Sequence, residues 1–229
     1  MKFEQNPRLK TELLTRLRTK YINPRAEMPH LSELLYCLTK AAYERRSPIP
    51  VTDAELIMFC IGFGLEDVIL RDDDTVAPVT VEFEGVWMTP DYVVLGPDNE
   101  LDLKSTRMYP DNDGSPKRGW PEGWIKQFMA YSYREAMTRL GHAPEYFEYS
   151  VGIIYLTPAR LEVGTLTWTR AEVLENWEKI ATRRNIFMGL MGANQIPTPF
   201  SYNEDWECKT CRYKLRCIGQ ASQNAGGLP

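Results

Sequence analysis

Asp102 and Lys104, in the segment ELDLKST, have the types and spacing that phosphodiester hydrolysis with a divalent metal ion requires. The segment is a predicted strand, so side chains two residues apart point to the same face. Asp91, on the strand predicted before it, can reach that face, and the backbone carbonyl of Leu103 can supply a further oxygen. Carboxylate and carbonyl oxygens suit Mg²⁺ and Mn²⁺, and a lysine beside them can orient the attacking water. The pattern predicts a Mg²⁺ or Mn²⁺ site for hydrolytic chemistry.

Four of the five cysteines form a second candidate site. Cys37 lies near the start of the chain, and Cys208, Cys211 and Cys217 follow near its end with C-x2-C-x5-C spacing. Four thiolates suit either Zn²⁺ or a 4Fe–4S cluster. Structural zinc usually takes paired C-x-x-C motifs, so the one-plus-three arrangement favours iron–sulfur and leaves zinc as the less favoured occupant. Cys60, within an apolar run, is predicted to be a core residue.

The charge distribution separates the chain into regions. The net charge is −4, but residues 1–50 carry +5 and residues 51–104 carry −11. An acidic middle suits a divalent cation, and the basic start is either a surface that neutralises phosphates or an ordinary solvated charge pattern. No apolar run is long enough for a bilayer and no signal-peptide pattern occurs, so we expect a cytoplasmic protein with reduced thiols and no membrane partner. The only histidines, His30 and His142, are predicted to lie at the surface.

Hydrophobic periodicity and breakers predict the elements that position these residues. One helix covers residues 6–22, and a second, with Ser32 as its N-cap, contains Cys37 and ends at Pro48. A third, capped by Thr52 or Asp53, covers residues 53–70. Two strands with a turn at Gly85 fill residues 79–96, and a short strand covers 100–106. The rest is a mobile loop over 106–119, helices over 120–140 and 170–191, strands over 149–159 and 161–169, and a Pro-rich turn before the last cysteines. The order predicts an α/β fold, a mixed β-sheet flanked by helices.

Taken together, these motifs resemble the PD-(D/E)XK nuclease superfamily. "PD" at Asp91 is followed by D-x-K at Asp102 and Lys104, and Gln127 and Tyr131 match the Q-x-x-x-Y motif of its RecB-like branch. The cysteine set resembles the iron–sulfur members of that branch, which include the CRISPR-associated RecB-like exonuclease (the fourth Cas protein) and stand-alone viral relatives. The resemblance covers nearly the whole chain, from Leu31 to Cys217.

The resemblance implies a restriction-endonuclease-like fold in one domain over residues 1–229. Within it, an N-terminal helical segment (1–50) would supply one cluster cysteine, a nuclease core (51–195) the catalytic centre, and a C-terminal segment (196–229) the other cysteines. It also implies catalytic and metal-binding roles in the central region. The catalytic residues would be Asp91, Asp102, Lys104, Gln127 and Tyr131, and the metal ligands Glu66, Asp91, Asp102 and the Leu103 carbonyl.

The implied activity is a Mg²⁺- or Mn²⁺-dependent DNA exonuclease on single strands or duplex ends, acting in DNA recombination, repair or CRISPR adaptation. Proteins of those pathways, or further copies of the chain, are the expected protein partners. A structure-specific endonuclease and a catalytically silent DNA-binding subunit are the alternatives.

One position departs from the pattern of the family. The RecB-like branch usually carries a histidine ligand in a G-x-x-x-H context, whereas here Gly62 leads to Glu66. A glutamate can take that role and would favour a harder ion. Asp67 is a poorer substitute because it lies on a different face of the helix. Trp120 and Trp124 are predicted to be core residues rather than platforms for stacked bases.

Overall fold

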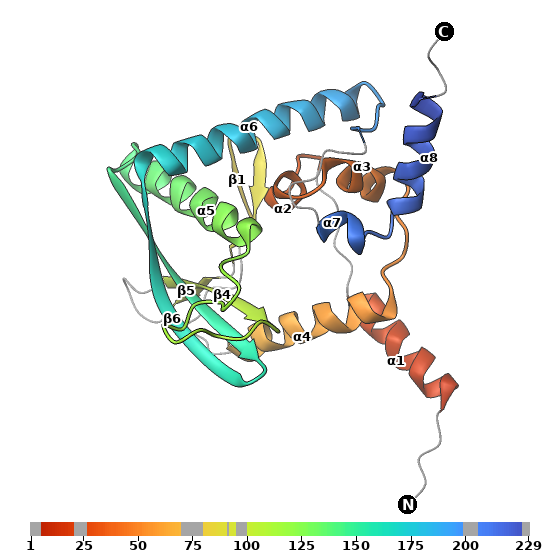
Figure 1. Ribbon diagram of the computed structural model, residues 1–229, viewed down its shortest axis with the longest axis horizontal. Coiled ribbons are helices and arrows are strands. Elements are labelled where there is room, and N and C mark those ends of the chain that lie inside the picture. The colour runs from red at the N-terminus through yellow and green to blue at the C-terminus, as the bar shows by residue number, and fades with distance from the viewer. Residues whose placement is uncertain are drawn as a thin grey trace, which may run out of the picture.

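The computed structural model describes residues 6–20, 27–69, 80–90, 92–94, 100–198 and 206–225. Its centre is a four-stranded sheet of β3 (Tyr92–Val94), β4 (Glu100–Thr106), β5 (Tyr146–Leu156) and β6 (Ala159–Thr169). The strands lie in this order, with an antiparallel, a parallel and an antiparallel pairing. The sheet is therefore mixed and helices flank it, which confirms the predicted α/β class (Figure 1).

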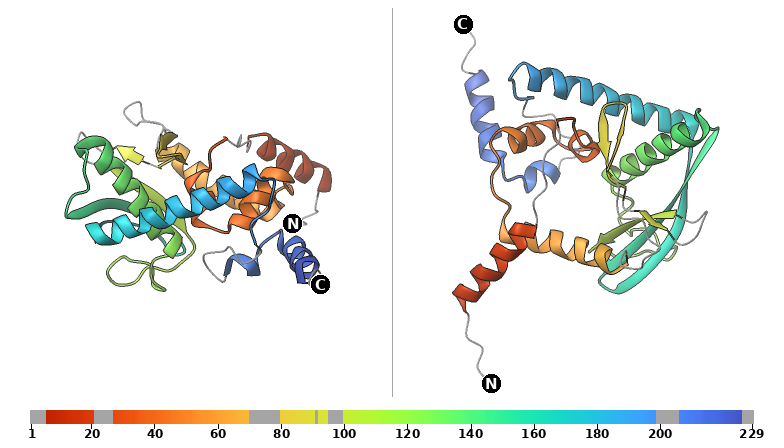
Figure 2. Two further views of the ribbon diagram at one scale, coloured as in Figure 1. Left: turned by 90° about the horizontal axis from the view of Figure 1, so that it is seen from above. Right: turned by 180° about the vertical axis from the view of Figure 1, so that it is seen from behind.

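The segment 79–96 supplies strands to two sheets, so the prediction of two strands there is wrong. Strands β1 (Val81–Phe83) and β2 (Val86–Met88) form a separate hairpin around the predicted turn, where Glu84 and Gly85 both have positive φ. Strand β2 ends at Met88 and β3 begins only at Tyr92. Pro90 lies between them, and a proline has no N–H to donate to a continuing ladder. From behind, the hairpin (yellow) reaches the long helix α6 (Figure 2).

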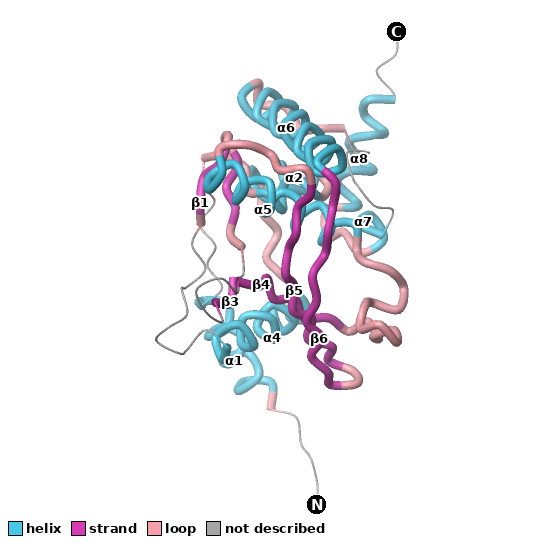
Figure 3. Tube along the Cα trace, turned by 90° about the vertical axis from the view of Figure 1, so that its left-hand side faces the viewer, coloured by secondary structure: helices cyan, strands magenta, loops and turns pink. Residues whose placement is uncertain are grey.

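Helices cover the two faces of the four-stranded sheet. Helices α5 (Glu122–Leu140) and α6 (Arg170–Gly192) lie on one side and α4 (Asp53–Ile69) on the other (Figure 3). The main core is on the α5 side, where Phe128 packs with Tyr149 of β5 at a ring separation of 5.4 Å. A small second core of Leu101, Leu103 and Ile154 faces away from it. The alternation of side chains along β4 produces this division.

The predicted second helix is two helices, α2 (Leu31–Leu35) and α3 (Leu38–Arg46). His30, not Ser32, is the N-cap of α2, and Cys37 is the N-cap of α3 rather than a residue inside a helix. The break has a tertiary cause. Arg183 of α6 donates to the carbonyls of Leu34 and Tyr36, and Glu207 accepts the Cys37 N–H at 2.6 Å. These contacts replace backbone hydrogen bonds that a continuous helix would make internally.

Two helices of the C-terminal segment, α7 (Trp206–Lys209) and α8 (Lys214–Ala225), were not predicted. They lie beside α3, so the C-terminal segment packs against residues 37–46, far from α1 (Figure 1). The buried Tyr213 stacks on Tyr43 at 5.5 Å, and its hydroxyl accepts the Ile49 N–H at 3.0 Å. Arg212 adds an ion pair with Glu44 at 2.8 Å. This junction is built from aromatic and ionic contacts of the protein itself.

The remaining elements follow the predictions closely. Helix α1 (Pro7–Lys20) and helices α4, α5 and α6 occupy the predicted ranges, and β5 begins three residues before its predicted start. Thr52 caps α4, because its hydroxyl accepts the Glu55 N–H at 3.2 Å while the Glu55 carboxylate accepts the Thr52 N–H at 2.8 Å. Within the described ranges, none of the helices has the length and hydropathy that crossing a bilayer would require.

Candidate active site and cysteine site

Asp102 and Lys104 meet on the α5 face of β4. Asp102 is fully buried, and its Oδ1 lies 2.6 Å from the ammonium of Lys104, whose side chain is 10% exposed. The hydroxyl of Tyr149 donates to the other carboxylate oxygen, Oδ2, at 3.3 Å. The Lys104 ammonium also lies 5.7 Å from the centre of the Phe128 ring, a cation–π contact from α5. Both side chains therefore have their orientation set by groups on neighbouring elements.

Sheet register explains this arrangement. Asp102 is opposite Val151 and Lys104 is opposite Ile153 in the parallel ladder with β5, so all four share one face. Ser105, between Lys104 and Thr106, points the other way. A Cβ at Gly62 of α4 would lie 4.0 Å from the Ser105 Oγ, so α4 approaches the opposite face of the strand.

Gln127 and Tyr131 share a face of α5, as predicted, and they bond to one another. The Gln127 Nε2 donates to the Tyr131 hydroxyl at 2.7 Å, and that hydroxyl donates to the backbone carbonyl of Thr89 at 3.0 Å. Tyr131 has no solvent exposure. Thr89 directly follows β2 and leads through Pro90 to Asp91, so this pair holds the backbone that enters the predicted metal site. The Tyr131 hydroxyl therefore contacts the backbone two residues before Asp91.

The predicted metal ligands are only partly within the described residues. Asp91 lies outside them, although the next residue, Tyr92, pairs with Asp102 across β3 and β4. Glu66 belongs to α4, but its side chain is likewise outside the described part. Leu103 lies between Asp102 and Lys104 on the same strand, with its side chain in the small second core. Among the residues that are described, no three Cys, His, Asp or Glu side chains converge on one point as ligands of a single ion would.

The four predicted cysteine ligands lie at the junction between α3 and the C-terminal helices. Cys37 is buried at the start of α3, Cys208 lies in α7, Cys211 between the helices and Cys217 in α8. Burial, together with the neighbouring Cys37, Cys211 and Cys208 thiols, raises the pKa of Cys217 to about 11. Burial also raises the pKa of Cys37. Cys37 and Cys217 therefore hold their protons at neutral pH, and a metal that binds these two thiols must displace those protons.

A cation accompanies these thiols. Burial lowers the pKa of Arg183, and the carboxylate of Glu207 opposes this effect, as does Cys37 once its thiol is deprotonated. The guanidinium stays charged in this setting because arginine has a very high ordinary pKa. It therefore lies where it can offset the charge of deprotonated cysteines.

Several contributing residues gave no signal in the sequence. Tyr149 and Thr89 are a strand tyrosine and a threonine with no motif around them. His30 is half-buried rather than a surface residue, and its Nε2 lies 3.1 Å from the Thr89 Oγ1. The predictions for His142, which is exposed, and for Trp120 and Trp124, which pack on the core, are confirmed. Cys60 is half-buried on α4 rather than in the core.

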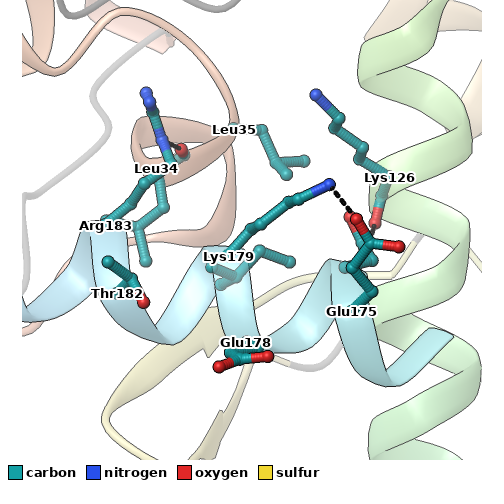
Figure 4. Close-up of a pocket in the computed structure, with 10 residues that line it drawn as sticks. Leu34, Leu35, Lys126, Glu175, Glu178, Lys179, Thr182 and Arg183 are labelled. Atoms are coloured by element: carbon teal, nitrogen blue, oxygen red, sulfur yellow. Dashed lines mark hydrogen bonds and ion pairs between the residues drawn. The ribbon is translucent and has the colours of Figure 1, made fainter. Parts of the chain in front are cut away.

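A separate hollow of about 580 Å³ lies between α2, α5 and α6, and it contains none of the predicted catalytic residues. Leu34, Leu35 and Ile180 form its apolar part. Lys179, Glu175, Lys126 and Arg183 place charges around it, and Lys179 pairs with Glu175 at 2.6 Å (Figure 4).

Comparison with known proteins finds a structure with a similar fold but does not assign the chain to a family. No family model matches the chain, and no curated protein sequence matches it. Among solved structures, the chain is similar to the crystal structure of SSO0001, with a TM-score of 0.52 and 15% identity over 92% of this chain and 97% of that one. At this identity the likeness concerns the fold alone.

Proposed function

We propose that this chain is a metal-dependent DNA nuclease of the RecB-like iron–sulfur type, acting as an exonuclease on single strands or duplex ends. The observation that carries the proposal is the Asp102–Lys104 pair on β4, facing the helix whose Gln127 and Tyr131 hold the approach to Asp91. Even when paired, a buried carboxylate and lysine carry a desolvation cost that their mutual attraction need not offset. A role in hydrolysis would explain why this charged pair is buried.

Each residue of the centre has a role in the proposed reaction. Asp102, the Leu103 carbonyl and the predicted ligands Glu66 and Asp91 would hold a Mg²⁺ or Mn²⁺ ion. When bound, such an ion lowers the pKa of water and neutralises charge on the scissile phosphate. Tyr149 fixes the Asp102 carboxylate by donating to it. Lys104 can donate from its ammonium to the attacking water or to a phosphate oxygen, and so orient the first or stabilise charge on the second.

The cysteines fit a structural role beside this centre. Cys37, Cys208, Cys211 and Cys217 would hold a 4Fe–4S cluster that ties α3 to the C-terminal helices, with Arg183 offsetting its negative charge. The one-plus-three spacing of the cysteines lacks the paired C-x-x-C motifs that are usual for structural zinc, which supports the cluster over zinc.

The test is cleavage of end-labelled linear and circular single-stranded DNA with Mg²⁺ or Mn²⁺. We expect the unmodified chain to degrade the linear substrate, and Lys104→Ala to lose several orders of magnitude in rate because water orientation and charge stabilisation both fail. Lys179→Ala, at an exposed ion pair on α6, is the matched control and should cleave normally.

The substrates separate the alternatives. Cleavage of the circle would identify an endonuclease. Binding without cleavage by the unmodified chain, under every divalent ion, would identify a silent DNA-binding subunit. A Lys104→Ala variant that cleaves at the normal rate would refute the assignment of the catalytic centre.

A further inference from the structure

The chain leaves β4 through a compact loop over residues 107–119 that carries a basic hollow of about 760 Å³. The hollow is lined by Thr106, Arg107, Met108, Tyr109, Lys117 and Arg118. Three of these side chains are cations, and none is an acid. Tyr109 is 58% exposed and presents its ring at the same place.

Internal hydrogen bonds hold this loop in shape. The Lys117 N–H donates to the Tyr109 carbonyl at 2.9 Å, and the Asp111 N–H donates to the Ser115 carbonyl at 2.7 Å, so the loop closes as a small hairpin. Its tip is attached to the sheet, because the Tyr155 hydroxyl of β5 donates to the buried Gly114 carbonyl at 2.9 Å. The loop was predicted to be mobile from its composition, but its backbone is well bonded. The cations at its base are therefore presented on a framework that is already ordered.

The acidic side chains of the loop accept hydrogen bonds from groups within the loop. Asp113 accepts from the Ser115 N–H and hydroxyl, which lowers the pKa of its carboxyl, and Asp111 accepts the Asn112 N–H. Asp113 lines a different, smaller hollow together with Glu162 of β6. Within the described part of the chain, no ion pair joins Arg107, Lys117 or Arg118 to a carboxylate. Their charges are available to an anion from outside.

The hollow begins where the catalytic strand ends. Thr106 lines it, and Thr106 shares the face of Lys104 because the two are two residues apart. Two residues of strand span about 7 Å, so a nucleic acid lying over Lys104 reaches the hollow within a few nucleotides. Cations for phosphates beside an exposed aromatic ring are the features of sites that bind single strands.

We infer that Arg107, Lys117, Arg118 and Tyr109 form a binding site for the single-stranded part of a DNA substrate, next to the catalytic centre. This inference deepens the proposed function. It rests on that function for the assumption that the bound strand continues to a catalytic centre at Asp102. The three cations contact phosphates, and Tyr109 stacks on one base. Stacking accepts any base, so binding is independent of sequence and selective for unpaired strands.

Binding of a fluorescent 20-nucleotide oligothymidine, measured by anisotropy in EDTA, tests the site without cleavage. In the variant Arg107→Ala/Lys117→Ala/Arg118→Ala, the slope of log K against log salt should shrink by about 2, since each phosphate contact contributes about 0.7 for single strands. A fourfold rise in salt should then weaken the unmodified chain about 15- to 20-fold more than the variant. The control Arg139→Ala/Arg170→Ala/Lys179→Ala removes equal charge from α5 and α6 and should keep the original slope.

Tyr109 is tested with the same probe and with a blunt duplex. Tyr109→Ala should weaken oligothymidine binding about tenfold, Tyr109→Phe should not, and neither should change duplex binding. An unchanged slope in the triple variant, or equal effects of Tyr109→Ala on both probes, would overturn the inference. If the triple variant has the smaller slope but the unmodified chain cleaves no DNA, the proposed function is refuted and the binding site in the loop stands. If the unmodified chain cleaves DNA but the triple variant keeps the original slope, only the binding site in the loop is refuted.

Discussion

At the scale of single residues, the hydroxyl of Tyr131 connects Gln127 of α5 to the backbone that leads to Asp91, a predicted metal ligand. It accepts from Gln127 and donates to the Thr89 carbonyl, while its ring stays fully buried against Tyr149. A group in this position cannot meet a substrate without unfolding its surroundings. It can fix the backbone that precedes Asp91.

Replacing Tyr131 with phenylalanine should therefore change the response to the metal ion rather than the affinity for DNA. We expect the Mn²⁺ concentration for half-maximal rate to rise about 10- to 100-fold, as is usual when a partner of a ligand-bearing segment is lost. Initial rates at varied Mn²⁺ and at varied DNA measure the two effects separately. Tyr133→Phe, on the same helix beside Trp177, is the control and should leave both unchanged. A rise in KM for DNA with unaltered metal dependence would assign Tyr131 to substrate contact instead.

At the scale of elements, helix α5 meets the α2–α3 junction at Gly123. A Cβ at this position would lie 2.6 Å from the Tyr36 Oη and 2.9 Å from two of its ring carbons, well inside contact distance. The backbone carbonyl of Tyr36 accepts a hydrogen bond from Arg183, and Cys37 follows it. The packing of α5 therefore depends on the absence of a side chain at this glycine.

Gly123→Ala should destabilise the protein by about 1–3 kcal/mol, the usual cost of overpacking. The matched substitution is Gly189→Ala on α6, where a Cβ would meet nothing within 4 Å. That change should be neutral or stabilising by up to about 1 kcal/mol, because alanine favours helix over glycine. Urea unfolding of both variants measures the difference. Equal stabilities of the two variants would contradict the close packing of Tyr36 on Gly123.

The start of α4 is connected to the C-terminal segment through Glu55. Burial raises the pKa of this carboxyl, but the hydrogen bonds from Thr52 and the charge of Arg212, 3.3 Å away, outweigh it, so the net shift is downward. A lowered pKa means that the charged form stabilises the fold above the ordinary glutamate pKa of about 4.3. That contribution disappears as the pH falls through the lowered pKa.

Glu55→Gln should therefore be less stable than the unmodified chain at pH 7, and the difference should shrink as the pH falls below about 4.3. The free energy of unfolding in urea between pH 7 and pH 3 measures this convergence. A stability gap that stays constant across this range would show that the Glu55 charge contributes nothing.

At the scale of the whole molecule, the four cysteines lie on two segments that are 171 residues apart at their nearest members, Cys37 and Cys208. The junction already contains the Tyr43–Tyr213 stack and the pairs of Arg212 with Glu44 and Glu55. A bound cluster would therefore reinforce an interface that the protein forms by its own contacts. Loss of the cluster should weaken the packing of α7 and α8 on α3 and leave the central sheet folded.

Protein purified without oxygen should be brown and contain iron and sulfide. Cys208→Ala should lose the colour and lower the Tm together, because binding energy of a metal group is also folding energy. Cys60→Ala, at the half-buried cysteine of α4, is the control and should keep both iron and colour. Stoichiometric zinc without iron in the anaerobic protein would contradict the cluster and show that the cysteines bind zinc.

Much of the architecture could be predicted because it depends on short-range patterns. The periodicity of α4, α5 and α6 and the alternation in β4 are local properties, and they identified the elements and the shared face of Asp102 and Lys104. Motif spacing likewise paired Gln127 with Tyr131 on one face of α5. These conclusions needed no knowledge of what packs against each element.

Tertiary contacts decided the rest. Only packing could divide the predicted second helix at Tyr36 and Cys37, because Arg183 and Glu207, more than 140 residues away, take up the backbone groups there. The partner of Tyr131 is a backbone carbonyl, which carries no sequence signature. The sequence by itself determined which groups could do chemistry and which strand and helix carry them. The tertiary structure decided which distant residues hold those groups in place, because a long-range contact depends on geometry that no local pattern encodes.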